Sequence, residues 1–111
     1  MNISTQAINT ILQRLDIEGL IESGAPSDEY GSEAEIIAFA LKELKIDEIN
    51  NANLQAIILE TWKNSFDLSA ADLQTRQAAF SNAAVTIVKS HFFQLSLINP
   101  FFPETFYKRQ G

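Results

Sequence analysis

The stretch from Gly24 to Glu35 holds the densest cluster of side chains with chemical capacity, namely Asp28, Glu29, Tyr30 and Glu33. Two carboxylates in a cleft can share acid–base catalysis, so an enzyme that uses them is one hypothesis, and it requires a concave site around Asp28. A surface loop implies no such pocket, however, and the spacing matches no calcium-binding loop. The ordinary interpretation is a capped loop with a solvated acidic face. The functional alternative is that these four residues contact a protein partner.

Other catalytic chemistry has little support in the sequence. The chain has no cysteine, which excludes thiol catalysis, disulfides and thiolate metal sites. Its single histidine, His91, falls on the apolar side of the last predicted helix, near the end of that helix, and is interpreted as a packing residue. No serine stands in a nucleophile motif, and the four glycines form no phosphate-binding loop. We therefore predict no enzymatic activity, no catalytic residue, no metal site and no cofactor.

The charge of the chain is distributed unevenly. The net charge is −6, and residues 1–60 carry 11 acidic and 3 basic side chains, a net of −8. Phosphates would be repelled, so nucleic acid is an unfavourable partner. A basic protein, or a head-to-tail contact between copies, is compatible with this asymmetry.

Two further patterns bear on the compartment. No apolar run approaches the ~20 residues of a membrane helix, and no signal-peptide pattern opens the chain. We therefore predict a cytoplasmic protein that does not associate with membranes.

Helical periodicity dominates the sequence and predicts an all-α fold, a compact bundle of four to five helices with an ordered aromatic C-terminal tail. In the second long helix the apolar stripe is Ile36, Ile37, Ala40, Leu41 and Leu44, and Phe39 widens the stripe or faces another neighbour. Ser32 and Glu35 fit a capping box at the start of that helix, as Ser69 and Asp72 do before the last one. The expected helices are Ser4 or Thr5 to Leu15, a short helix or single turn over 16–23 that Asp16 caps and Gly24 closes, Glu33 to Lys45, Asn51 to Ser65, and Ala70 to His91.

The only tryptophan, Trp62, shares one helical face with Leu54, Ile57 and Ile58. A tryptophan on an apolar face usually lies in the core with its indole N–H hydrogen-bonded. We expect that role for Trp62 rather than a role as a recognition anchor.

The last twenty residues form a separate segment in our prediction, with a helical domain over 1–91 and a tail over 92–111. The tail contains five phenylalanines, and an exposed aromatic tail is a liability in a soluble monomer. We therefore expect it to pack on its own domain or on a second copy. The expected contact residues are Phe92, Phe93, Phe101, Phe102 and Phe106.

Three short motifs occur along the chain: Asp28-Glu29-Tyr30 ahead of a helix with an acidic start, Ile57-Ile58 with Trp62 and Phe66, and Leu68-Ser69 before the last helix. In these motifs the chain resembles the YugE-like family of small bacterial proteins. One departure is that Asp16 precedes Ile17 here, where the family has proline. The resemblance covers about residues 8–90 and implies a compact helical bundle of unassigned function, with no catalytic residue.

Two hypotheses about function follow from these observations. The first is a protein-interaction or immunity-type module whose acidic surface binds a basic partner, with Asp28, Glu29 and Glu33 at the rim. The second is a homodimer that uses the aromatic tail as its contact and binds a small ligand between helices or at the dimer interface.

Overall fold

The computed structural model describes residues 3–98, and the side chains of residues 3–92. Within this range the chain is all-helical and compact, which confirms the predicted fold class. Its elements are α1 (Thr5–Leu15), α2 (Gly31–Lys42), the short 3₁₀ helix η1 (Ile46–Glu48), α3 (Asn51–Phe66), α4 (Ala70–Thr75) and α5 (Gln77–Ile98).

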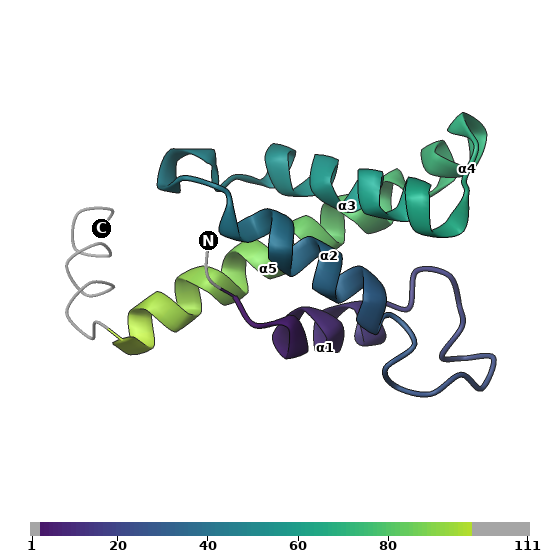
Figure 1. Cartoon of the computed structure of the whole chain (residues 1–111), viewed down its shortest axis with the longest axis horizontal. Helices are drawn as coiled ribbons and strands as arrows, with labels where there is room; N and C mark the ends of the chain where they lie inside the picture. The colour runs from purple at the N-terminus through teal and green to yellow at the C-terminus, as the bar shows by residue number, and fades with distance from the viewer. Residues whose placement is uncertain (1–2, 99–111) are drawn as a thin grey trace.

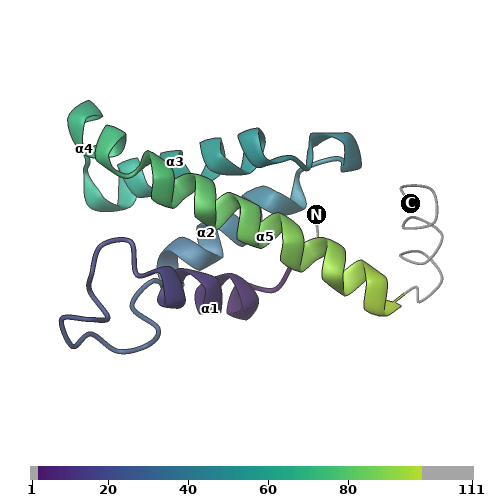
Figure 2. The ribbon, with the colours of Figure 1, turned by 180° about the vertical axis from the view of Figure 1, so that it is seen from behind.

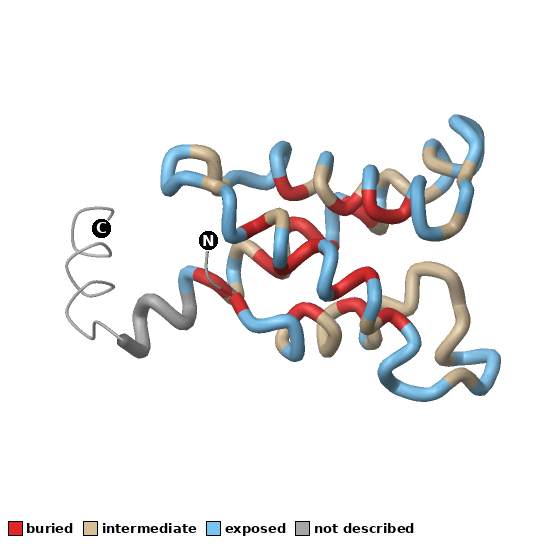
Figure 3. Tube along the Cα trace, viewed as in Figure 1, coloured by how far each residue is buried: buried red, intermediate tan, exposed pale blue. Residues whose placement is uncertain are grey.

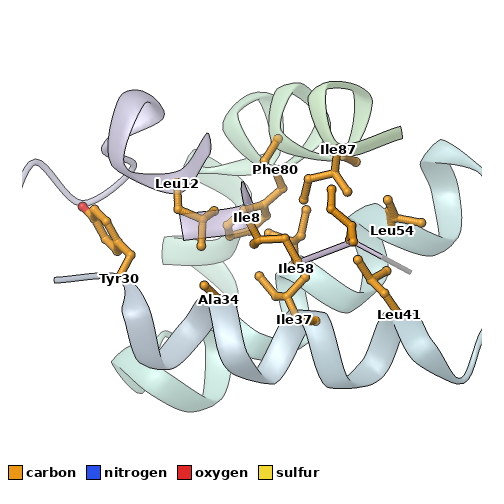
Figure 4. Close-up of a cluster of buried hydrophobic side chains, with 14 of the residues drawn as sticks. Ile8, Leu12, Tyr30, Ala34, Ile37, Leu41, Leu54, Ile58, Phe80 and Ile87 are labelled. Atoms are coloured by element: carbon orange, nitrogen blue, oxygen red, sulfur yellow. The ribbon is translucent and has the colours of Figure 1, made fainter. Parts of the chain in front are cut away.

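α5, the longest element, packs mainly against α3 and also against α1, and α2 packs against α1 and α3. In Figure 1, α2 lies in front of α5, with α3 above and α1 below, and Figure 2 shows α5 crossing the opposite side of the molecule. Buried positions follow the inner faces of α1, α2, α3 and α5 (Figure 3). Figure 4 shows isoleucine and leucine side chains from these helices meeting in one cluster. None of the helices described here combines the length and the apolar character that crossing a bilayer requires.

The start of α1 agrees with the sequence prediction. The Ser4 hydroxyl accepts a hydrogen bond from the Ala7 amide at 3.0 Å, and Ile8 and Leu12 are buried. The Ser69 and Asp72 capping box at α4 also forms, through two hydrogen bonds of 3.1 Å.

The capping box predicted at Ser32 and Glu35 is wrong. α2 begins at Gly31, and its N-cap residue is Tyr30, with no capping side chain. The chain enters the helix directly from a turn in which the Gly31 amide donates to the Asp28 carbonyl at 2.8 Å. Ser32 therefore already lies in the first helical turn, where its side chain is exposed.

Two other predicted boundaries also differ. The expected helix 70–91 is broken at Arg76, which has φ −104° and separates α4 from α5. α5 then continues to Ile98, so it crosses the predicted domain boundary at 91–92 and His91 is not near its end. Residues 99–111, with Phe101, Phe102 and Phe106, and the side chain of Phe93 lie outside what the structure describes, whereas Phe92 is exposed.

Candidate functional site

Asp16 organises the loop between α1 and α2. It follows the last residue of α1 in a left-handed conformation, with φ 45°. Its carboxylate accepts hydrogen bonds from the amides of Ile21 at 3.0 Å and Glu22 at 2.9 Å. These bonds hold residues 17–24 as a series of turns rather than the short helix that was one alternative. Asp16 therefore caps the turns of this loop, and Gly24, with φ 107°, closes them.

Tyr30 connects this loop to the core. Its side chain is fully buried, and its hydroxyl donates to the Asp16 Oδ1 at 2.6 Å and accepts from the Glu18 amide at 3.1 Å. Its ring stacks on Trp62 with a centroid distance of 5.8 Å. The prediction that Tyr30 contacts a partner at the surface is therefore wrong, because its ring and its hydroxyl are both occupied inside the protein. Glu33 is only 8% exposed, so the prediction that it contacts a partner at the surface is wrong as well.

Glu18 is the second anchor of the loop. Its Oε2 accepts from the Trp62 indole Nε1 at 2.9 Å and from Arg76 Nε at 2.6 Å, and its Oε1 accepts from Arg76 Nη2 at 2.9 Å. One carboxylate thus joins the loop, α3 and the break between α4 and α5. A bidentate arginine–carboxylate pair has a fixed geometry, so it holds the loop against the break at Arg76.

We call the following set the polar network: Asp16, Glu18, Tyr30, Trp62 and Arg76. The pKa values of its four titratable members are shifted. The hydrogen bond from Tyr30 lowers the pKa of Asp16. The hydrogen bonds that Arg76 donates to Glu18 lower the pKa of Glu18, and the same bonds raise the pKa of Arg76. Burial, followed by the bond to Asp16, raises the pKa of Tyr30 to about 12. Each of these shifts moves a pKa further from 7, whereas a general acid or base works best with a pKa near the operating pH. We therefore interpret the network as a structural one that holds the loop on the core.

Asp28 and Glu29 are separate from this network. Both lie exposed in the turn that leads into α2, as predicted for contact residues. His91, in contrast, is buried on α5, and burial lowers the pKa of its imidazole. In the described part of the chain, no group of three or more histidine, aspartate or glutamate side chains is placed to hold a metal ion.

The second notable region is a shallow groove of about 220 Å³ between α2 and α3. Most of the surface that faces the groove is apolar. The residues that line it are Ile36, Ala40, Ile57, Glu60, Thr61 and Asn64. Ile36 is 51% exposed, and Phe39, three residues further along α2, is 71% exposed. We call this region, with Phe39 beside it, the α2–α3 groove.

Sequence reasoning did not identify this groove. It placed Ile36 in the stripe that packs on the core, whereas α2 uses Ala34, Ile37, Ala38 and Leu41 for that purpose. The available signal was that α2 has more apolar residues than one face needs, so a second apolar face must remain. Comparisons with protein-family models, with curated proteins and with solved structures find no match to this chain.

Proposed function

We propose that this protein is a protein-interaction module, and that the α2–α3 groove binds an apolar segment of a partner that also carries basic residues. The observation that carries this proposal is the exposure of Ile36 and Phe39 beside a concave apolar surface. Large apolar side chains scattered singly on a surface need no explanation, but grouped beside a groove they are typical of interaction sites.

The charge around the groove supports a basic partner. Glu60 lines it, and Glu43, the C-cap residue of α2, follows Phe39 by four positions. Both carboxylates are exposed, and the first 60 residues have a net charge of −8. Such carboxylates steer a cationic segment toward the surface and make its association sensitive to salt.

The size of the groove indicates modest affinity. Complete burial of an Ile or Phe side chain contributes about 1.5–3 kcal/mol, and Ile36 and Phe39 are already partly covered. Association also costs at least about 4 kcal/mol of translational and rotational freedom. We therefore expect weak and reversible binding, with a dissociation constant on the order of micromolar or above.

The test uses defined peptides. One is an amphipathic helical peptide with a leucine and phenylalanine face and lysine flanks, and the other has the same apolar face and glutamate flanks. We expect the lysine peptide to bind tighter, and its affinity to fall as salt rises, when fluorescence anisotropy is measured at low and high salt. Equal binding of both peptides would contradict the predicted charge preference.

A matched pair of variants locates the binding surface. Ile36→Ser removes an apolar residue of the groove, whereas Ile46→Ser makes the same change at a residue of η1 that is 90% exposed and does not line the groove. Truncation of a central contact typically costs more than 1 kcal/mol, about fivefold in affinity. We expect at least that loss for Ile36→Ser and less than a twofold change for Ile46→Ser. Unchanged binding by Ile36→Ser would exclude the groove.

The resemblance to the YugE-like family stays a prediction. Of the residues discussed in that comparison, Asp16, Tyr30 and Trp62 all belong to the polar network. A family likeness at these positions would therefore concern the way the loop is held, and it supplies no chemistry for the proposed function.

A further inference from the structure

We propose that a second copy of this chain covers the outer face of α2, with the two α2 helices packed antiparallel about a two-fold axis near Phe39. The inference rests on the proposed function, because this face carries the exposed apolar side chains of the α2–α3 groove. It adds that the face is complementary to itself, so copies of the chain cover one another where no partner is bound. Dimer formation then limits the access of a partner to the groove.

The outer face of α2 is a continuous stripe of exposed side chains. The stripe comprises Glu35, Ile36, Phe39 and Lys42. Each of the other members stands three or four residues from Phe39, so all of them lie on one side of the helix. Figure 1 shows α2 crossing the front of the molecule, with no other described helix over it. The stripe is apolar at its centre and charged at its two ends, and charges that flank an apolar seam set the partner and the orientation of helix pairs.

The order of the charges favours an antiparallel pair. Glu35 and Lys42 stand seven residues apart, so they lie on the same side of the helix, about 10.5 Å apart along its axis. A two-fold axis midway between them places Glu35 of each copy opposite Lys42 of the other, which gives two ion pairs. A parallel pair in register would instead place like charges opposite each other. Among the described residues, neither side chain has an ion-pair partner in its own chain, so both are available.

The apolar centre of the stripe is complementary to itself about the same axis. The midpoint falls beside Phe39, so the two Phe39 rings lie close together, and Ile36 of each copy faces the small side chain of Ala40 on the other. Phe39 and Ile36 both have apolar surface left to bury. The α2–α3 groove of about 220 Å³ also has room for a phenyl ring, since an apolar cavity of about 150 Å³ holds benzene. Each copy thus offers a projecting ring beside a groove that can receive one.

The size of the contact predicts a weak dimer. Stable interfaces bury about 800 Å² on each partner, whereas α2 has 12 residues and is about 18 Å long, so one of its faces supplies less than that area. The two ion pairs are exposed and are screened by salt. We expect a dissociation constant on the order of 0.1 mM at low salt. The groove is open well below this concentration and increasingly covered above it.

Charge reversal across the axis tests this arrangement. Sedimentation equilibrium at low salt follows the monomers and dimers of the full-length protein from about 10 µM to about 1 mM, a range that brackets the expected constant. Glu35→Lys and Lys42→Glu each place like charges opposite each other twice, so each should weaken the dimer at least about threefold. The double variant with Glu35→Lys and Lys42→Glu exchanges the charges within both pairs, and it should regain the original affinity to within about twofold.

Matched controls separate this contact from an effect of net charge. Glu22→Lys and Lys89→Glu make the same two charge changes at exposed positions outside α2, and each should leave the dimer affinity within about twofold of the original. A protein that stays monomeric at the highest concentration would overturn the proposal. So would a dimer that the single reversals leave unchanged, or a double variant that dimerises no better than the single ones.

Peptide binding separates this inference from the proposed function. If the unchanged protein stays monomeric while Ile36→Ser still weakens binding of the lysine-flanked peptide, the contact between copies is excluded and the proposed function stands. If the charge reversals behave as expected while Ile36→Ser leaves peptide binding unchanged, the copies pair and the proposed function fails.

Competition tests whether the dimer limits access to the groove. An excess of the lysine-flanked peptide should convert the dimer into monomers, because peptide and second copy cover the same apolar side chains. A dimer that persists with the peptide bound would overturn the regulatory part of the proposal, since the two contacts would then use different faces.

Discussion

The polar network and the α2–α3 groove differ in how far their side chains find partners within the molecule. In the network, the Tyr30 hydroxyl, the Trp62 indole and two guanidinium nitrogens of Arg76 all donate to carboxylates of the same chain. In the groove, Ile36 and Phe39 remain largely exposed to water. The network is complete within the molecule, whereas the groove presents apolar surface that a further segment can still cover.

This difference shows which region is free to bind. A ligand at the network would have to break short hydrogen bonds and leave buried polar groups unpaired, which costs about 1–3 kcal/mol for each group. A ligand at the groove breaks nothing and gains roughly 25 cal/mol for each Å² of apolar surface it covers. The residues with the most conspicuous chemistry therefore hold the fold together, and plainer apolar residues form the candidate binding surface.

The largest expected effect comes from Glu18→Ala. It leaves the Trp62 indole N–H and the partly buried Arg76 guanidinium without their acceptor, and a buried donor left unpaired costs about 1–3 kcal/mol. We expect that decrease in the free energy of unfolding, measured with urea at pH 7. Glu22→Ala, at an exposed residue of the same loop, is the control and should change stability by less than about 0.5 kcal/mol.

The stability difference between Glu18→Ala and the unchanged protein depends on pH in a defined direction. The pKa of Glu18 is lowered in the folded protein, so its stabilising effect is complete above its unfolded-state pKa of about 4.3 and is lost as pH falls through the folded-state value. The difference between Glu18→Ala and the unchanged protein should therefore narrow below about pH 4. A constant difference down to pH 2 would show that Glu18 acts through packing rather than charge.

A smaller effect is expected for Tyr30→Phe. The change keeps the ring that stacks on Trp62 but removes the hydroxyl between Asp16 and the Glu18 amide. Loss of these hydrogen bonds should lower the free energy of unfolding by about 1–2 kcal/mol at pH 7. A loss below about 0.3 kcal/mol would mean that the ring alone fixes the loop.

Tyr30 also predicts behaviour at alkaline pH. Its folded-state pKa is raised to about 12, so its contribution is complete below the unfolded-state value of about 10 and is lost between pH 10 and 12. The unchanged protein should therefore lose stability in that range, while Tyr30→Phe changes less. Parallel decreases in both proteins would assign the alkaline transition to other groups.

The fold was largely predictable because local signals and core packing agree. α1 and α3 follow from one apolar face each, Ser4 and Ser69 from capping chemistry, and Trp62 from its position on an apolar face. The location of Trp62 in the core and its bonded indole N–H are confirmed. These features depend on neighbours three or four residues apart, and a sequence displays such neighbours directly.

The polar network was not predictable in the same way. Glu18 lies 44 residues from Trp62 and 58 from Arg76, and no spacing rule connects such positions. The sequence predicts one continuous helix through Arg76, because nothing local indicates that its guanidinium is fixed by a distant carboxylate. Tyr30 was assigned to the surface by its acidic neighbours, whereas the carboxylate that binds it is Asp16.

The smallest expected effect concerns Asp28 and Glu29, which belong neither to the polar network nor to the α2–α3 groove. These carboxylates are exposed in a turn, so the double variant Asp28→Lys and Glu29→Lys should alter the free energy of unfolding by no more than about 0.5 kcal/mol. If they only steer a cationic segment, the association rate of the lysine-flanked peptide falls a few-fold at low salt, while its dissociation rate is unchanged. At high salt the effect should vanish, because exposed charges farther apart than the ~3–10 Å Debye length are screened. A faster dissociation rate would instead place both residues in direct contact with the partner, and the binding surface would then extend from the groove to this loop.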